Sequence, residues 1–299
     1  MKQVSYFAPA ELDDALKLLA EHGEKVTVLA GGTDILPKLN HYELKPEAVM
    51  YIGGLGLSFI RDEGEKLVFG AATSTAALAK SEVVESKMKA LSEAARLSAS
   101  PAIRTSATIG GNIVNASPAG DVLTALVALG AEVKLQKAGG QRMVPLEDFV
   151  TGPRQTDLKP GELLTEVHVP VPNGATAFLK LGRRKAQTLS VVNVAVQVSL
   201  EGGECKDARI VLGAMAPTPV RCTKAESLVR SCAFPLAISH FGTRPASAGK
   251  SLDEATIAQC AAQAVEECSP IDDQRATAWY RKKAAKALVA KALKQVSQN

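Results

Sequence analysis

The sequence has no closely spaced cysteines. Its five cysteines, Cys205, Cys222, Cys232, Cys260 and Cys268, all lie in the C-terminal third of the chain and form no C-x-x-C pair. An odd count at such spacing argues against disulfide frameworks, zinc sites and iron–sulfur ligand sets. The first residues, M-K-Q-V-S-Y-F, also lack the apolar core of a signal peptide. We therefore expect reduced thiols, no metal site in this chain and a cytoplasmic protein.

Aromatic residues and long apolar runs are also scarce. Only 4% of the residues are aromatic and the net charge is +4, so we expect no base-stacking surface for nucleic acid. No apolar run approaches the roughly 20 residues that a membrane-spanning helix needs. With 46% hydrophobic residues in a chain of 299, there is enough apolar material for a core and enough length for two domains.

The most informative stretch is Val26–Leu36, which reads V-T-V-L-A-G-G-T-D-I-L. Its β-branched start indicates a buried strand, Gly31-Gly32 a turn, and Thr33 or Asp34 the cap of a following helix. A strand, a glycine turn and a helix start together direct backbone N–H groups at one point, which favours an anion such as phosphate. Neither G-x-G-x-x-G nor a P-loop lysine is present, so an ordinary strand-to-helix turn is the alternative.

A second stretch repeats this chemistry. Residues 108–114 read T-I-G-G-N-I-V, and the segment continues as a hydroxyl-rich loop to S-P-A-G-D at 117–121. Neither stretch contains Lys or Arg, so backbone dipoles would neutralise the ligand without a basic clamp. We therefore predict a pyrophosphate site formed by two glycine loops that are distant in the sequence.

A catalytic acid–base set is missing. The four histidines, His22, His41, His168 and His240, are scattered, and no H-x-x-x-H motif or distinctive carboxylate pair occurs. A dinucleotide site without such groups is best explained if the cofactor carries the chemistry, which favours a flavin. We predict no catalytic residue in this chain.

Two charged residues outside the glycine pairs are further candidates. Asp121 can accept a hydrogen bond from a sugar or ribityl hydroxyl, or it can cap the helix that is expected from Val122. Lys180, in a predicted strand, can place its charge near a flavin carbonyl or phosphate, or it can be an edge lysine whose charge reaches solvent.

The apolar patterns predict a chain of mixed helices and strands with a boundary at Pro172-Asn173-Gly174, where the composition changes. Before the boundary we expect a helix ending at Gly23, strands 26–29 and 48–52 in a β-α-β unit, hairpins at Glu63-Gly64 and Gly139-Gly140, helices near 76, at 88–97 and at 121–130, and a strand at 163–171. After it we expect strands at 177–181, 191–200 and 208–213, and helices at 223–229, 253–268 and 272–295. Residues 231–250 show no period and are assigned no structure.

The glycine motifs and the end of the chain resemble one family. A-G-G-T-D at 30–34, T-I-G-G-N-I at 108–113 and S-P-A-G-D at 117–121 are similar to the FAD-binding subunit of the molybdenum hydroxylases, relatives of xanthine dehydrogenase and carbon monoxide dehydrogenase. P-I-D-D-Q-R at 270–275 and W-Y-R at 279–281 resemble the ending of the same family. The likeness covers nearly the whole chain, and residues 231–250 depart from it.

The resemblance implies a fold and a cofactor. It implies an α+β protein. A two-part FAD-binding domain of the vanillyl-alcohol-oxidase (PCMH) type would span 1–173, split near 55–60, and a C-terminal α/β domain with a small antiparallel sheet and helices would span 174–299. It implies non-covalent FAD with its diphosphate between the two glycine segments. The residues implied or predicted to contact the cofactor are Leu29, Ala30, Gly31, Gly32, Thr33, Asp34, Ile35, Ser98, Thr108, Gly110, Gly111, Asn112, Ser117, Asp121, Leu164 and Lys180.

The resemblance also implies partners. A large molybdopterin subunit would oxidise the substrate, a small [2Fe–2S] subunit would deliver electrons to this FAD, and an external acceptor such as NAD⁺ or a quinone would receive them. Two alternatives stay open from the residues. One is a self-contained FAD oxidoreductase with its own small substrate, and the other is a scaffold module without flavin.

Overall fold

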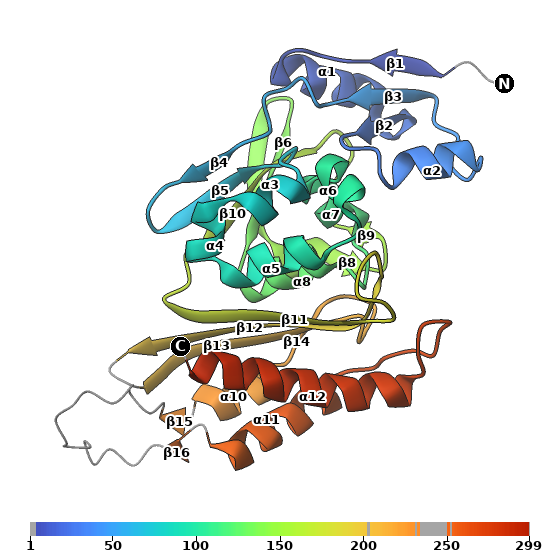
Figure 1. Ribbon diagram of the computed structural model, residues 1–299. Helices are drawn as coiled ribbons and strands as arrows, with labels where there is room; N and C mark the ends of the chain where they lie inside the picture. Colours follow the sequence, from blue (N-terminus) through green and yellow to red (C-terminus); the bar gives the residue numbers. More distant parts are fainter. Residues whose placement is uncertain (1–3, 202–203, 231, 234–249, 252, 299) are drawn as a thin grey trace.

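The computed structural model describes residues 4–201, 204–230, 232–233, 250–251 and 253–298, with sheets and helices stacked from the N-terminal to the C-terminal part of the chain (Figure 1). Most of the segment 231–250, which carries no period in the sequence, lies outside the described residues. Among the described helices, none combines the length and the apolar character that crossing a bilayer requires.

The first sub-domain, blue in Figure 1, is a parallel sheet with two helices. Its elements are β1 (Ser5–Phe7), α1 (Leu12–His22), η1 (Gly23–Lys25), β2 (Val26–Leu29), α2 (Ile35–Asn40) and β3 (Ala48–Tyr51), with the strand order β1-β3-β2. Ala15, Leu16 and Leu19 are buried on one side of α1, because residues three and four apart share a helix face. The predicted β-α-β unit is confirmed, since β2 and β3 pair in parallel.

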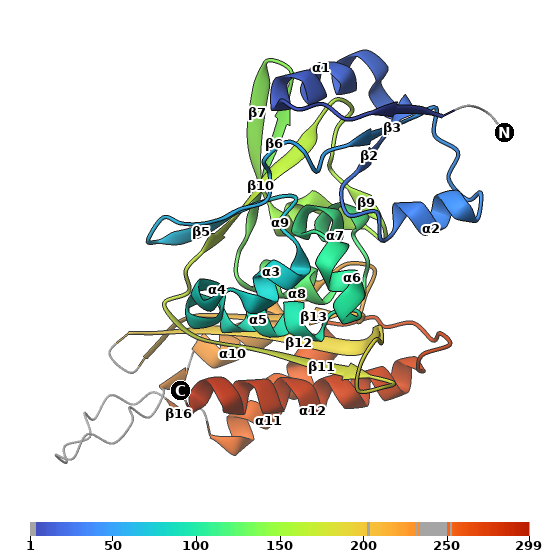
Figure 2. The same ribbon diagram turned by 45° about the horizontal axis from the view of Figure 1, so that its top comes forward.

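The second sub-domain is a five-stranded antiparallel sheet packed against helices. Its strands, in the order β4-β5-β10-β6-β7, are β4 (Ile60–Asp62), β5 (Lys66–Gly70), β10 (Leu163–Pro170), β6 (Glu132–Lys137) and β7 (Gly140–Pro145). Both predicted hairpins are present, with Gly64 and Gly139 at φ values of +83° and +77° that suit glycine. Figure 2 shows α1 beside the β6–β7 hairpin, and this contact joins the first sub-domain to the second.

Short helices fill the space between this sheet and the C-terminal part. They are α3 (Thr75–Lys80), α4 (Glu82–Lys87), α5 (Lys89–Leu97), α6 (Pro101–Ser106), α7 (Ile109–Asn115), α8 (Asp121–Ala128) and α9 (Leu146–Phe149), followed by the small hairpin of β8 (Val150–Gly152) and β9 (Gln155–Thr156). The apolar helices predicted at 88–97 and 121–130 correspond to α5 and α8.

The prediction of a loop around the second glycine pair is wrong. Residues 101–115 form α6 and α7, and Gly110-Gly111 lie in the first turn of α7. Side-chain caps start both helices, because Ser100 Oγ accepts from Ile103 N at 3.2 Å and Thr108 Oγ1 accepts from Gly111 N at 3.0 Å. Two glycines therefore do not prevent a helix where a threonine cap and tertiary packing support it.

The C-terminal part is a mainly antiparallel sheet together with three helices. It contains β11 (Gly174–Gly182), β12 (Ser190–Glu201), β13 (Glu204–Gly213), β14 (Val220–Arg221), α10 (Thr223–Arg230), β15 (Cys232–Ala233), β16 (Lys250–Ser251), α11 (Glu254–Glu266) and α12 (Ala278–Ser297). Among the described strands of this sheet, only β15 and β16 pair in parallel. The last helix begins at Ala278 and not near Asp272 as predicted. Asp273 instead forms a turn in which its side chain accepts from Arg275 N at 2.8 Å, and Thr277 caps α12.

The C-terminal sheet has helices on both faces. α10 and α12 pack on one face, while α5 and α8 contact the other (Figure 1). Phe178, Ala195 and Val211 of this sheet are buried in the same apolar cluster as the helices of the second sub-domain. The α+β class with a two-part first domain and a further C-terminal domain is confirmed.

Candidate functional site

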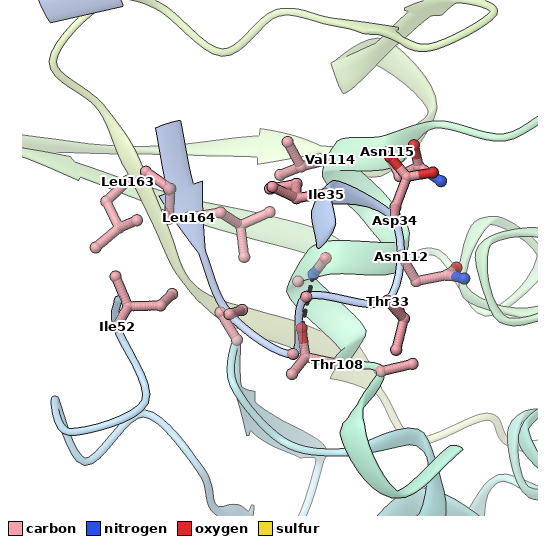
Figure 3. A pocket seen from close by; sticks show the side chains of 18 of the residues that line it. Thr33, Asp34, Ile35, Ile52, Thr108, Asn112, Val114, Asn115, Leu163 and Leu164 are labelled. Carbon is pink, nitrogen blue, oxygen red and sulfur yellow. Dashed lines mark hydrogen bonds between the residues drawn. The ribbon is translucent and has the colours of Figure 1, made fainter. Parts of the chain in front are cut away.

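A pocket of about 370 Å³ lies where the β2–α2 turn, α7 and the start of β10 meet (Figure 3). Eleven of the predicted cofactor residues line it: Ala30, Gly31, Gly32, Thr33, Asp34, Ile35, Thr108, Gly110, Gly111, Asn112 and Leu164. The structure therefore brings the two glycine segments to one cavity, although more than 70 residues separate them in the chain.

Glycine is required for this approach. A Cβ on Gly31 would lie 1.7 Å from the carbonyl oxygen of Ser106, and a Cβ on Gly110 would lie 2.8 Å from that of Ala71. Both contacts are with backbone, which cannot rotate away as a side chain would. Gly31 thus allows the first segment to approach the residues before α7, and Gly110 allows α7 to pack on Ala71.

The first glycine segment offers unbonded amides. Within the described part of the chain, no backbone carbonyl accepts from the N–H groups of residues 31–35, and the first bonded amide is Leu36 N, 2.9 Å from Gly32 O. Gly32 has φ +72°, which directs successive N–H groups to the same side. Because exposed amides in this arrangement attract negative charge, residues 31–35 form an anion cradle.

The second segment does not form a matching cradle, contrary to the symmetric arrangement predicted from the sequence. Its amides from Ile109 to Asn112 are bonded within the protein, to Thr73 O, Ala71 O, Thr108 Oγ1 and Thr108 O in turn. What this segment presents to the pocket is the Thr108 hydroxyl, which can still donate its hydrogen, and the Asn112 side chain. The buried Oδ1 of Asn112 has no protein partner among the described residues. A polar ligand would satisfy it.

Two cations line the pocket, although neither glycine stretch contains one. Lys38 of α2 pairs with Asp34 at 2.5 Å. Arg154, in the β8–β9 turn, donates to Asp34 Oδ1 at 3.2 Å and to Asn115 Oδ1 at 2.6 Å. Burial disfavours the ionised Asp34, but these two cations more than offset it, so the pKa of this carboxyl lies below its ordinary value. The predicted side-chain cap by Asp34 does not form.

The opposite end of the pocket is apolar apart from one carboxylate. Figure 3 shows Ile52, Leu163 and Leu164 together there, away from Asp34 and Asn115, and Val28 and Leu158 are also among the residues that line the pocket. Glu162, only 7% exposed, adds the carboxylate. Sequence reasoning did not select Glu162, Lys38 or Arg154, and no local motif marks them.

Five of the predicted residues do not line this pocket. They are Leu29, Ser98, Ser117, Asp121 and Lys180. Ser117 instead lines a second hollow of about 530 Å³, together with Pro118, Ala119, Arg154, Leu189 and the turn 273–275. Arg154 lines both spaces, so the second hollow adjoins the end of the first pocket that carries Asp34 and Asn115.

Asp121 and Lys180 contact each other and form the centre of a buried network. Lys180 Nζ lies 2.6 Å from Asp121 Oδ2, while Ser190 Oγ and Asn193 Nδ2 donate to Oδ1 at 2.6 and 2.8 Å. Burial raises the pKa of Asp121 even though Lys180 and the two neutral donors favour its charged form. Asp121 is the first residue of α8 and makes no capping bond, since Gly120 occupies the cap position. The capping alternative is therefore wrong, and so is the reading of Lys180 as an edge lysine in solvent.

Ser98 lies at the end of α5, where its carbonyl accepts from Arg104 at 2.8 Å. Lys180 Nζ also donates to the neighbouring Leu97 O at 3.1 Å. This end of α5 thus meets β11 close to the Asp121 network.

The histidines of the described residues lie apart from this site. No group of three or more His, Cys, Asp and Glu side chains among the described residues is arranged to hold a metal ion. His168 contacts Glu166 at 2.7 Å on β10, and His22 stacks on Phe7 at 5.3 Å between ring centroids, both outside the pocket lining.

Comparison with protein families matches two models along the chain. The model described as the FAD binding domain in molybdopterin dehydrogenase matches residues 2–172. The model of the CO dehydrogenase flavoprotein C-terminal domain matches residues 177–234 and 235–296.

Individual relatives are similar over almost their full length. The chain is 31% identical to the glyceraldehyde dehydrogenase medium chain of Sulfolobus acidocaldarius over 296 residues, which cover 99% of both chains. It is 32% identical to the carbon monoxide dehydrogenase medium chain of Afipia carboxidovorans, covering 97% of this chain and 95% of the relative.

Solved structures show the same fold. A carbon monoxide dehydrogenase structure from Hydrogenophaga pseudoflava matches with a TM-score of 0.88 and 30% identity, over 98% of this chain and 97% of that chain. Quinoline 2-oxidoreductase from Pseudomonas putida 86 matches with a TM-score of 0.88 and 27% identity, over 99% and 97%.

Proposed function

Because this chain belongs to the family of FAD-binding subunits of the molybdopterin dehydrogenases, we propose that it is the electron-exit subunit of a multi-subunit dehydrogenase. It takes electrons from [2Fe–2S] clusters of a small partner subunit, while a large partner subunit carries the molybdopterin. It passes them to an external acceptor such as NAD⁺ or a quinone.

The observation that carries this proposal is the anion cradle at residues 31–35, with an apolar space on one side and the second hollow on the other. The parts of a flavin dinucleotide follow the same order, because its diphosphate lies between the adenosine and the flavin. We place the diphosphate at the cradle, the adenine between Ile52 and Leu164, and the flavin toward the second hollow beyond Arg154.

The chain's own residues then bind and orient the cofactor. Amides of residues 31–35 donate to phosphate oxygens, and the Thr33 and Thr108 hydroxyls donate to phosphate or ribityl oxygens. Asn112 turns a buried, unpartnered amide oxygen toward a cofactor hydroxyl. When bound, FAD supplies reversible electron transfer, so the protein needs no nucleophile or proton-transfer residue of its own.

The remaining predicted residues support the flavin end in this proposal. Asp121 holds the start of α8 against β12 through Ser190, which follows Leu189, and against β11 through Lys180. Ser117, before α8, and Leu189, before β12, line the second hollow.

Ser98 follows Leu97, whose carbonyl accepts from Lys180 at 3.1 Å, so it lies at the same network. Leu29 instead precedes the cradle, and its carbonyl accepts from Ile52 N at 3.0 Å.

We propose that the FAD domain spans 1–173, split near 55–60, and that the C-terminal domain spans 174–299. The relatives' designations as medium chains support an assembly of medium, large and small subunits for this protein as well. The assignment concerns electron transfer only, because substrate oxidation takes place on another chain.

Affinity purification of the full chain from its own cells, with cofactor analysis, tests the proposal. We expect FAD in this chain, together with two co-purifying chains that bring molybdenum and iron. FAD without partners or metals would overturn the proposal in favour of a self-contained flavoenzyme, and a colourless protein would overturn it in favour of a scaffold.

A further inference from the structure

The adenine end of the pocket is formed by a strand edge. β10 pairs with β5 from Glu166 onward, and Leu163 and Leu164 pair only with β6 on the other side. At these two residues the edge of β10 therefore has no strand beside it among the described elements. Such an edge presents main-chain donors and acceptors in the pattern that an adenine edge can bind.

The segment leading into this edge is held by one arginine. Arg142 of β7 donates through Nε and Nη2 to the two oxygens of Glu162, at 2.7 and 2.8 Å. Its Nη1 donates to Asp157 Oδ2 at 2.7 Å, and Nη2 also reaches Asp157 O at 2.6 Å. The guanidinium thus fixes both ends of residues 157–162 with four bonds.

The fixed segment carries the pocket wall. Glu162 Oε2 accepts from Lys159 N at 2.9 Å, which closes the turn over 159–162, and Leu158 and Leu163 flank this turn in the pocket. The Glu162 side chain is 5% exposed, so its charge needs Arg142 nearby. Arg142 itself is not among the residues that line the pocket.

We propose that Arg142 is a positioning residue that shapes the adenosine end of the pocket through Glu162 and Asp157, and so makes the chain select FAD over FMN. This inference rests on the proposed FAD placement and deepens it. Without the guanidinium, Glu162 is a buried carboxylate without a cationic partner, and the turn moves to hydrate it. The displaced wall includes Leu158 and the edge at Leu164, while the cradle at 31–35 belongs to another sub-domain and stays in place.

The test is a titration of the apoprotein of the full chain with FAD, FMN and ADP. In Arg142→Met, which keeps the apolar stem, we expect the Kd for FAD to rise about tenfold or more and that for FMN to change less than twofold. ADP should lose its ability to compete with FAD. Arg96→Met is the matched control, because Arg96 pairs with Glu85 at 3.1 Å outside the pocket and should leave all three affinities unchanged.

Two further variants separate positioning from general destabilisation. Glu162→Gln combined with Arg142→Met should be no worse than the more severe single variant, because both changes break the same contact. Arg142→Lys keeps the cation but offers its donors from a single nitrogen, so it should retain part of the preference for FAD over FMN, and it can be measured even if Arg142→Met does not fold.

An unchanged FAD/FMN ratio in variants that melt earlier would overturn the inference and assign Arg142 a structural role only. Failure of the unaltered protein to bind FAD would instead refute the cofactor placement, so the two failures are distinguishable.

Discussion

Lys180 of β11 and Asp121 of α8 form an ion pair with 2.6 Å between Nζ and Oδ2, and their side chains are only 6% and 5% exposed. The pair joins the C-terminal sheet to the helices of the second sub-domain. A charge taken this far out of water is stable only with its partner in place.

Lys180→Met should therefore destabilise the protein by about 3–5 kcal/mol, because it leaves Asp121 buried without a cation. Urea denaturation of the apoprotein measures this change. Adding Asp121→Asn to the same variant should recover a large part of the loss, since both charges are then absent. No recovery would mean that the loss in Lys180→Met does not come from an unpaired charge on Asp121.

The matched control for Lys180 is Lys17. Lys17 pairs with Asp14 at 3.1 Å, and both side chains are more than half exposed. Lys17→Met should change the stability by less than about 1 kcal/mol, since exposed ion pairs contribute little.

Gly31→Ala should open the pocket and release FAD. The new methyl carbon would meet the Ser106 carbonyl at 1.7 Å, so the β2–α2 turn has to move away from the segment before α7. We expect a FAD content below a tenth of normal and a lower melting temperature. Gly140→Ala is the control, because its nearest neighbour is the Lys137 side chain at 3.8 Å and its φ is not positive. Full retention of FAD in Gly31→Ala would contradict the convergence of the two segments.

Thr108→Val should combine a cap defect with a binding defect. Loss of the bond to Gly111 N removes about 1 kcal/mol of helix stabilisation, and loss of the hydroxyl removes a donor to the cofactor. Ser81→Ala deletes a comparable cap on α4, away from the pocket. Melting temperatures of the two apoproteins should fall similarly, while FAD affinity should fall only in Thr108→Val. Equal affinities would remove this hydroxyl from the binding site.

The stabilising effect of Glu162 should depend on pH in the acid range. The hydrogen bonds from Arg142 exceed the opposing effect of burial, so the pKa of Glu162 lies below its ordinary value of 4.5. A lowered pKa means that the stabilisation is complete above pH 4.5 and disappears as the pH falls through the lower, folded-state pKa. The difference in melting temperature between the unaltered protein and Glu162→Gln should stay constant above about pH 5 and shrink below pH 4.5. A difference that grows on acidification would contradict this sign.

Local patterns were sufficient for most of the elements. Hairpins at Gly64 and Gly139 and the strand before Gly31 follow from alternation and glycine placement, which act within a few residues. The helix through Gly110 was missed because its stability comes from the Thr108 cap and from packing on Ala71, a contact that the local sequence does not contain.

The part of the site formed by backbone amides could be predicted from the sequence. The part formed by side chains that are distant in the sequence could not. The anion cradle at 31–35 follows from a strand, two glycines and a helix start. Arg154 reaches Asp34 across 120 positions, and Arg142 reaches Glu162 from another hairpin, so only the folded chain reveals either contact. The distance between Asp121 and the main pocket likewise depends on how α8 packs against β12.

The burial of Phe178, Ala195 and Val211 in the apolar cluster of the second sub-domain has a consequence for how this protein can be divided. A fragment ending at Asn173 would lose these side chains, and the apolar surface of α5 and α8 that they cover would be exposed to water. The two matched family segments are therefore separate in sequence but share one apolar core. A protein truncated at their junction would aggregate before it could bind its cofactor.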